Sequence, residues 1–99
     1  MIVVRMGPGA GWNPSAGSRG QRLWPEHAEF MDDLFGRGLI ELAGPLADGS
    51  GAVVVVRSES PDQVRGWFDA DPWMVHDILP VREVREWTIV LDGRTGQGT

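Results

Sequence analysis

Residues 39–57, LIELAGPLADGSGAVVVVR, decide the fold, because they contain two expected strands joined by a tight turn. The segments 39–46 and 52–57 have the composition of strands, and the DGSG sequence at 48–51 between them is a turn signal. Pro45 lacks an amide proton, so the first of these strands is expected at a sheet edge or with a bulge. The middle of the chain is therefore predicted to be a β-hairpin.

Each side of this hairpin is predicted to carry one further strand and a helix. Residues 2–6 (IVVRM) are apolar on both faces, as in a central strand, and a helix is expected over 25–37. A capping-box helix over 60–71, a short helix over 72–78 and a last strand over 81–91 should follow the hairpin. This order is the split βαβ pattern of ferredoxin-like domains, an α+β fold with an antiparallel sheet and the helices on one face.

Length and composition indicate one small domain. The chain has 99 residues, of which 41% are hydrophobic, and we expect a single domain over 1–91 with a flexible polar tail over 92–99. The net charge of −5 disfavours nucleic acid as a partner, and no apolar run approaches the ~20 residues that span a bilayer. The N-terminus is too short for a signal peptide, which predicts a cytoplasmic location.

The predicted topology leaves one face of the sheet without helices. The strand over 52–57 is apolar on both faces, and Trp87 lies on the last strand. Exposed apolar faces of this kind usually mark interfaces. We therefore expect a homodimer that packs sheet to sheet, as in a dimeric α/β barrel.

His27 is the most informative side chain for function. It lies on the apolar stripe of the first helix with Phe30, Met31 and Leu34, so it should face the interior. In the predicted topology, the start of this helix and the end of the second helix meet at the same end of the molecule. Asp71 lies at that second terminus, so the two side chains are expected to converge.

Two interpretations of this pair remain open. His27 is either an acid-base group oriented by Asp71 or a core histidine bound to the backbone. Asp71 precedes a proline and is also suited to cap the next helix. His76 is expected on the surface, and no ligand spacing supports a metal site.

Several segments together resemble the YCII-related family. They are Trp24-Pro25-Glu26-His27, Gly38-Leu39 to Ala43-Gly44-Pro45-Leu46, Asp48-Gly49, Asp69-Ala70-Asp71-Pro72-Trp73 and the final strand with Trp87, which cover residues 1 to about 91. The resemblance implies a ferredoxin-like fold, a dimer and a histidine–aspartate pair proposed as catalytic, which His27 and Asp71 match. Relatives include a dehydrochlorinase of a chlorinated hydroquinone, muconolactone isomerases and cofactor-free oxygenases. The loop with Trp12-Asn13-Pro14-Ser15 departs from shorter members of the family.

The remaining candidates are expected to bind a small ligand. Trp12, Trp73 and Trp87 could wall an apolar pocket, and Gly44 and Pro45 reach the same end of the molecule. The end of the molecule that bears the long loop is locally positive, with Arg5, Arg19 and Arg22, and this would suit a carboxylate or phenolate. The glycine-rich start of this loop at 7–11 lacks a dinucleotide fingerprint, so no cofactor is expected.

Two functions follow from these residues. The first is a small cofactor-independent enzyme, an isomerase, dehydrohalogenase or lyase, in which His27 and Asp71 act on a small organic acid or phenol. The absence of Cys, Lys and Tyr excludes thiolate, Schiff-base and phenolic catalysis. The second is a noncatalytic module that binds a small ligand or assembles with a partner.

Overall fold

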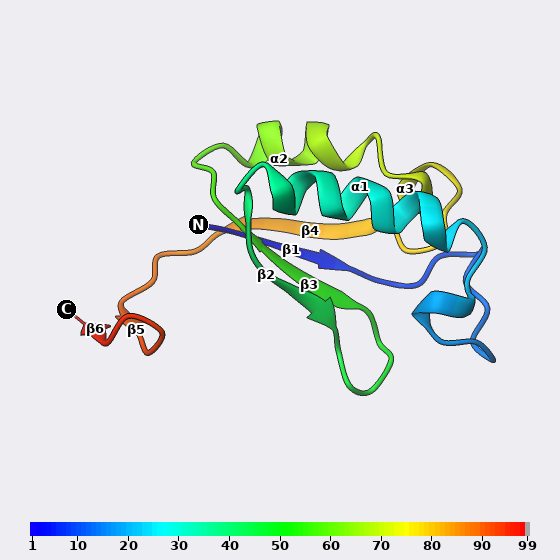
Figure 1. Cartoon of the computed structure of the whole chain (residues 1–99), viewed down its shortest axis with the longest axis horizontal. Helices are drawn as coiled ribbons and strands as arrows, with labels where there is room; N and C mark the ends of the chain where they lie inside the picture. Colours follow the sequence, from blue (N-terminus) through cyan, green and yellow to red (C-terminus); the bar gives the residue numbers. More distant parts are fainter. Residues whose placement is uncertain (99) are drawn as a thin grey trace.

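A computed structural model describes residues 1–98 of the chain. Its main sheet has four antiparallel strands, β1 (Ile2–Met6), β2 (Ile40–Pro45), β3 (Ala52–Val56) and β4 (Val81–Glu86), in the order β2-β3-β1-β4 (Figure 1). This is the predicted α+β, ferredoxin-like arrangement, with β1 in the centre and β2 at an edge. The register of β2 also shifts between Ile40 and Leu42, so the strand that contains Pro45 has both an edge position and an irregularity.

The helices form a single layer over one face of the sheet (Figure 1). They are α1 (Trp24–Gly36), α2 (Pro61–Phe68) and the short α3 (Pro72–Val75), and a 3-10 turn, η1 (Ser18–Gly20), precedes α1. Ser60 caps α2 by accepting a hydrogen bond from the N–H of Gln63. No helix among the described residues is long and apolar enough to cross a membrane.

The hydrophobic core lies between this helical layer and the sheet. Alternate residues of the strands point into it, and the helices contribute Leu34, Val64 and Phe68. Trp73 is the largest side chain that is fully buried. Because Trp73 is buried beside the polar side chains of His27 and Asp71, the predicted site borders the hydrophobic core.

Both helices after the hairpin end earlier than the sequence predicts. α2 ends at Phe68 instead of Asp71, because Asp71 takes an extended conformation before Pro72 (φ −70°, ψ 124°). α3 ends at Val75 instead of Ile78, because Asp77 has a left-handed conformation (φ 55°) that an α-helix does not accommodate. The first of these stops leaves Asp71 in the turn between α2 and α3, where its side chain is buried.

The last strand is also shorter than predicted. β4 ends at Glu86, and the N–H of Trp87 then donates a hydrogen bond to the carbonyl of Met1. The chain then forms a separate two-stranded ribbon, β5 (Leu91–Asp92) and β6 (Gln97–Gly98). The expected tail over 92–99 thus contains regular pairing, and Thr99 lies outside the described residues.

The loop over residues 7–22 packs closely against the connection between α3 and β4. The N–H groups of Gly9 and Gly11 donate hydrogen bonds to the carbonyls of Ile78 and Asp77. A Cβ atom at Gly9 would collide with the carbonyl oxygen of Asp77, so this approach requires glycine. The glycine-rich start of the loop is therefore explained by backbone packing.

Candidate functional site

His27 and Asp71 are in direct contact. The Nδ1 atom of His27 lies 2.9 Å from Oδ1 and 3.0 Å from Oδ2 of Asp71. The histidine is 7% exposed and the aspartate 0%. Forty-four residues separate them in the sequence, so the contact depends on the packing of α1 against the turn between α2 and α3.

Local structure fixes both partners of this contact. Leu23 precedes α1 in a left-handed conformation (φ 64°), and its carbonyl accepts a bond from the N–H of His27, so His27 lies in the first turn of the helix. Asp71 is the N-cap of α3, and its Oδ1 accepts a hydrogen bond from the N–H of Trp73 at 3.0 Å. The aspartate therefore caps a helix and binds the histidine with the same carboxylate.

Trp73 packs against one face of the imidazole. The two rings are stacked, with centroids 3.8 Å apart and 4° between their planes. The indole is itself anchored, because its Nε1–H donates a hydrogen bond to the carbonyl of Arg22 at 2.9 Å. The position and the plane of the His27 ring are thus both determined by the Asp71-Pro72-Trp73 turn.

The second nitrogen of His27 faces a pocket. A carboxylate accepts hydrogen bonds, so the contact with Asp71 assigns the proton to Nδ1 and leaves a lone pair on Nε2. Nε2 has no hydrogen-bond partner in residues 1–98. Every fully buried side-chain nitrogen in this part of the chain has a partner, so Nε2 is not fully buried. Since His27 lines the pocket, Nε2 is the atom available to a ligand.

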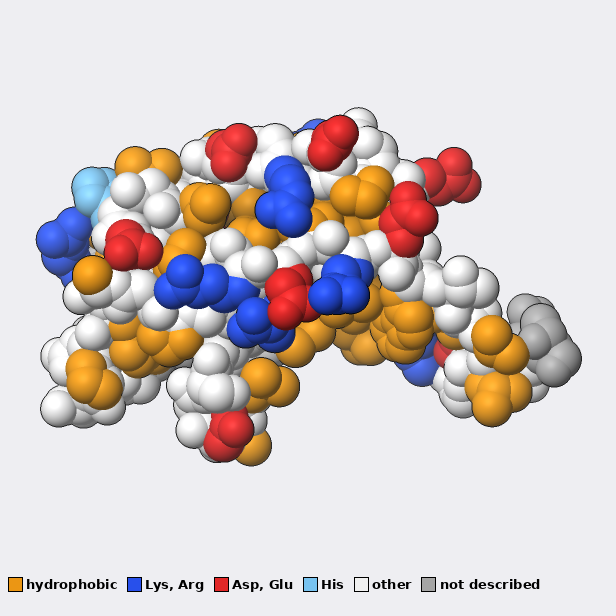
Figure 2. Space-filling model, turned by 180° about the vertical axis from the view of Figure 1, so that it is seen from behind, with side chains coloured by type: hydrophobic (Ala, Val, Ile, Leu, Met, Phe, Trp, Pro, Cys, Tyr) orange, Lys and Arg blue, Asp and Glu red, His pale blue; other side chains and the backbone are white. Residues whose placement is uncertain are grey.

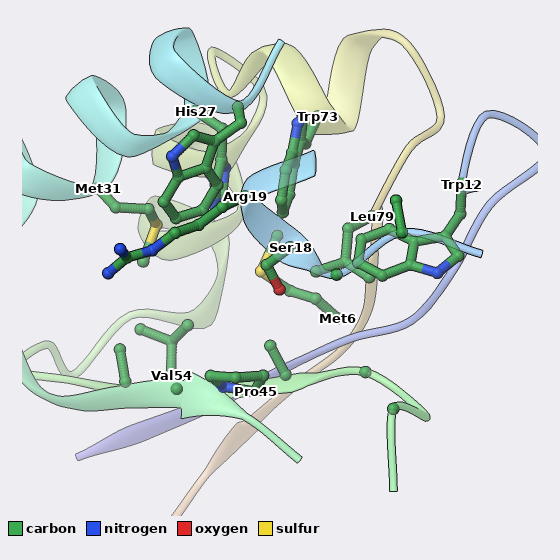
Figure 3. A pocket seen from close by; sticks show the side chains of 18 of the residues that line it. Met6, Trp12, Ser18, Arg19, His27, Met31, Pro45, Val54, Trp73 and Leu79 are labelled. Atoms are coloured by element: carbon green, nitrogen blue, oxygen red, sulfur yellow. The ribbon is translucent and has the colours of Figure 1, made fainter. Parts of the chain in front are cut away.

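The pocket has a volume of about 720 Å³ and lies between α1, the sheet and the loop over 7–22 (Figure 3). This volume suits a small organic molecule. Figure 3 shows His27 and Trp73 on the helical side, Pro45 and Val54 on the sheet side and Trp12 toward the far end. Most of the lining is apolar, including Met6, Trp12, Trp24, Met31, Pro45, Val54, Trp73 and Leu79.

The loop over 7–22 forms one wall of this pocket and is held in place by Gln21. This side chain is 4% exposed; its Nε2 donates to the carbonyls of Asn13 (2.7 Å) and Ala16 (3.0 Å), and its Oε1 accepts from the N–H of Asn13 (2.8 Å). Trp12 packs edge to face on Trp73, with centroids 5.8 Å apart. The loop that departs from shorter family members is therefore part of the candidate site.

The ionisable side chains that line the pocket are His27, Arg19 and Asp48, within the described chain. Asp48 lies in the turn between β2 and β3, where hydrogen bonds from Ser50 lower the pKa of its carboxyl group. Asp48 is consequently ionised at neutral pH and already bound within its own turn. No group of three or more His, Cys, Asp or Glu residues among the described residues is arranged to hold a metal ion.

The structure brings most of the predicted site residues together and separates two of them. Trp12, Gly44, Pro45 and Trp73 line the pocket with His27. Arg22 is excluded from the lining because its guanidinium turns outward to Nδ1 of His76, 3.1 Å away on the exposed surface.

Trp87 is 47% exposed and lies at the opposite end of β4, beside Met1. Trp87 therefore does not line the His27 pocket of its own chain, and a role in ligand binding stays a prediction. The cause is the direction of β4, which runs away from the pocket before it reaches Trp87.

Sequence reasoning missed several lining residues. Trp24 lies three positions before His27 on the same helix, and the two rings are 5.9 Å apart, so helical spacing could have indicated it. Arg19 was recognised only as part of a positive loop. Its place in the pocket depends on the 3-10 turn η1, which the sequence pattern does not reveal.

These features define a class of protein: an α+β chain with a ferredoxin-like antiparallel sheet, helices on one face of it and a pocket at one end of the sheet. The chain belongs to the YCII-related family, because the family model of the YCII-related domain matches residues 3–88. This confirms the resemblance in the sequence. No curated protein matches the chain in sequence.

The same fold is found in a solved structure. It is the 5-chloro-2-hydroxyhydroquinone dehydrochlorinase TftG from Burkholderia phenoliruptrix in complex with 2,5-dihydroxybenzoquinone. The TM-score is 0.64 and the sequence identity 19%, and the alignment covers 98% of this chain and 100% of that chain. At this identity, the likeness establishes the architecture and leaves the reaction to be argued from the site.

Proposed function

We propose that this protein is a small cofactor-independent enzyme that transfers a proton on a small organic acid or phenol. The observation that carries the proposal is the hydrogen bond from Nδ1 of His27, a residue that lines the pocket, to the fully buried Asp71. This bond leaves Nε2 of the same ring without a partner among the described residues. This arrangement is typical of a general base whose tautomer is set by a carboxylate. His27 is the proposed catalytic residue, and Asp71 is a positioning residue.

The proposed step is the removal of a proton from the substrate by Nε2 of His27. The electron pair of the broken C–H or O–H bond moves into the conjugated system of the substrate, and Asp71 stabilises the resulting imidazolium. In an isomerisation the same proton returns at another atom. In a dehydrohalogenation the pair forms a new π bond, the halide leaves with the electron pair of its own carbon–halogen bond, and the proton on Nε2 passes to solvent. The name of the structural neighbour TftG, a dehydrochlorinase, supports the second type as one specific reaction to test.

The apolar walls support this chemistry. Trp24 and Trp73 surround the His27 ring with hydrocarbon surface, with their own centroids 5.7 Å apart. A pocket of this kind displaces water from a bound substrate and strengthens interactions between charges that develop during proton transfer. A flat aromatic or enolic ring would fit between such walls.

The test is solvent deuterium exchange, because it detects proton transfer before the complete reaction is known. The protein is incubated in D₂O with 5-chloro-2-hydroxyhydroquinone, 2,5-dihydroxybenzoquinone and a set of small 2-oxo acids, and exchange and chloride release are measured. We expect catalysis with at least one compound and a loss of about 10²- to 10⁴-fold in His27→Ala. His76→Ala is the matched control, since His76 lies outside the pocket.

Two outcomes would contradict the proposal. One is equal exchange in the wild-type protein and in folded His27→Ala. The other is tight binding of these compounds without exchange or turnover, which would instead support the alternative of a noncatalytic ligand-binding module.

We also propose that two copies pack through the open face of the sheet. Val3, Val53 and Val55 point away from the helical layer, because Ile2, Val4, Val54 and Val56 point into the core. Leu42, which pairs with Val55, is 54% exposed. Hydrophobic side chains also gather in the hollow between the body and the C-terminal segment (Figure 2).

In this proposal, Trp87 contributes to the dimer interface and not to the pocket of its own chain. Together with Val90 and Leu91, which are 52% and 77% exposed, it belongs to the exposed apolar surface near the chain end. A second copy of the chain would cover such surface.

A further inference from the structure

Arg19 is the one cationic side chain that lines the pocket in the described part of the chain, apart from the titratable His27. Its guanidinium has no hydrogen-bond or ion-pair partner in residues 1–98. Other arginines are bound to carboxylates, namely Arg5, Arg37, Arg57, Arg85 and Arg94. An unpaired guanidinium beside an apolar pocket therefore lacks the counterion that this chain gives to most of its arginines.

Hydrogen bonds within the loop over 7–22 fix the position of Arg19. Arg19 lies in the centre of the turn η1, and the Gln21 side chain binds the chain directly before this turn, at the carbonyls of Ala16 (3.0 Å) and Gly17 (3.4 Å). The turn closes through the N–H of Gln21, which donates to the carbonyl of Ser18 at 3.2 Å. A buried amide thus supports the segment that presents the guanidinium.

Arg19 and His27 occupy the same cavity. Figure 3 shows the side chain of Arg19 extending across the pocket between the helical side, with His27 and Met31, and the sheet side, with Val54 and Pro45. Asp48 is the fixed anion of the lining, but its carboxylate is bound by Ser50 in its own turn. The guanidinium of Arg19 is consequently the one charged group of the lining that has no partner within residues 1–98.

We infer that Arg19 determines substrate specificity by binding the carboxylate of a planar, monocyclic acid whose ring packs against the tryptophans and presents its reactive proton to Nε2 of His27. This inference rests on the proposed function and narrows its substrate class from acids and phenols in general to ring carboxylates. A guanidinium binds a carboxylate through two parallel hydrogen bonds, which fixes orientation as well as charge. Neutral phenols of the same shape would lack this anchor.

The experiment compares two probes of nearly the same size and shape, the anionic 2,5-dihydroxybenzoate and the neutral 2,5-dihydroxybenzamide. Their affinities are measured by isothermal titration calorimetry with the full chain at low and moderate salt. We expect the wild-type protein to favour the carboxylate by about tenfold or more, as for one charge-assisted interaction. The preference for the carboxylate should disappear in Arg19→Met. It should survive in part in Arg19→Lys, which keeps the charge but cannot form two parallel hydrogen bonds.

Arg22→Met is the matched control, because the Arg22 guanidinium lies outside the pocket and only its backbone carbonyl supports Trp73. This variant should keep the full preference. Equal affinity of the wild-type protein for both probes, an unchanged ratio in Arg19→Met, or no binding of either probe at millimolar concentration would each overturn the inference.

These results separate the inference from the proposed function. If His27-dependent deuterium exchange occurs without a carboxylate preference, the role of Arg19 is wrong and the proton-transfer function stands. If the preference depends on Arg19 but no compound undergoes exchange, the anion site stands and the enzymatic proposal is wrong.

Discussion

His27 lies flat on the indole of Trp73, and the same short turn that provides this indole also provides the carboxylate of Asp71. The imidazole is thus held by its face and by its Nδ1 edge through two residues that are only two positions apart. The hydrogen bond from the Trp73 N–H to Asp71 links the two supports. A change in this turn is therefore expected to affect ring orientation as directly as it affects stability.

Asp71→Asn should separate the structural role of Asp71 from its role in orienting His27. The asparagine oxygen can still accept the bond from the Trp73 N–H, but the negative charge beside the imidazole is lost. We expect a fall in turnover on the order of 10²-fold with little change in substrate binding. In ¹⁵N NMR spectra, the wild-type His27 should be protonated at Nδ1, and the variant should show a mixture of tautomers.

Asp71→Ala should be much more damaging to the fold. It removes the cap of α3 and leaves the buried Nδ1–H of His27 without an acceptor. We expect the free energy of unfolding to fall by about 1.5–5 kcal/mol, of which the unpaired donor accounts for about 1–3 and the lost cap for about 0.5–2, as measured by urea denaturation. Unchanged stability in Asp71→Ala would show that water replaces the carboxylate and that the contact is not structural.

Trp73→Phe tests the anchor of the indole. The variant keeps an aromatic ring against His27 but loses the Nε1–H bond to the carbonyl of Arg22 and part of the ring volume. We expect a loss of about 1–3 kcal/mol in the free energy of unfolding. Trp67→Phe is the comparison, since Trp67 is only partly buried and its indole nitrogen donates no hydrogen bond within residues 1–98; it should cost less.

Gln21→Ala should loosen the pocket wall without removing any lining side chain. The carbonyls of Asn13 and Ala16 and the N–H of Asn13 would lose their partner. We expect faster amide hydrogen exchange in residues 13–17 and weaker binding of any ligand that contacts Arg19. Gln63→Ala, which alters an exposed glutamine near the start of α2, should leave exchange in this loop unchanged. Equal protection in the two variants would refute the role of Gln21.

Val53→Asp tests the proposed dimer. A carboxylate on the open face of the sheet would be buried at a sheet-to-sheet interface, which is costly for an unpaired charge. Light scattering coupled to gel filtration should show the mass of two chains for the wild-type protein and of one chain for the variant. Val75→Asp, at a 65% exposed position on the helical layer, should remain dimeric. A monomeric wild-type protein would rule out the interface.

The order of the elements could be predicted from local signals. The turn at 48–51, the proline at 45 and the cap at Ser60 each act within a few residues, and these signals are sufficient to place the strands and helices. The ends of elements were less predictable. β4 stops at Glu86, which pairs with Ile2 of β1, so the end of this strand depends on a different part of the chain.

The sequence by itself determined the antiparallel ferredoxin-like order and the convergence of His27 and Asp71, because both follow from helix periodicity and from the direction of successive elements. Only the tertiary structure decided which side chains enter the pocket. Arg22 turns outward to His76 while Arg19 lines the cavity, although the two are three residues apart in one loop. The physical reason is the set of long-range contacts of Gln21, Trp12 and Trp73, which fix the path of the loop and leave no local pattern in the sequence.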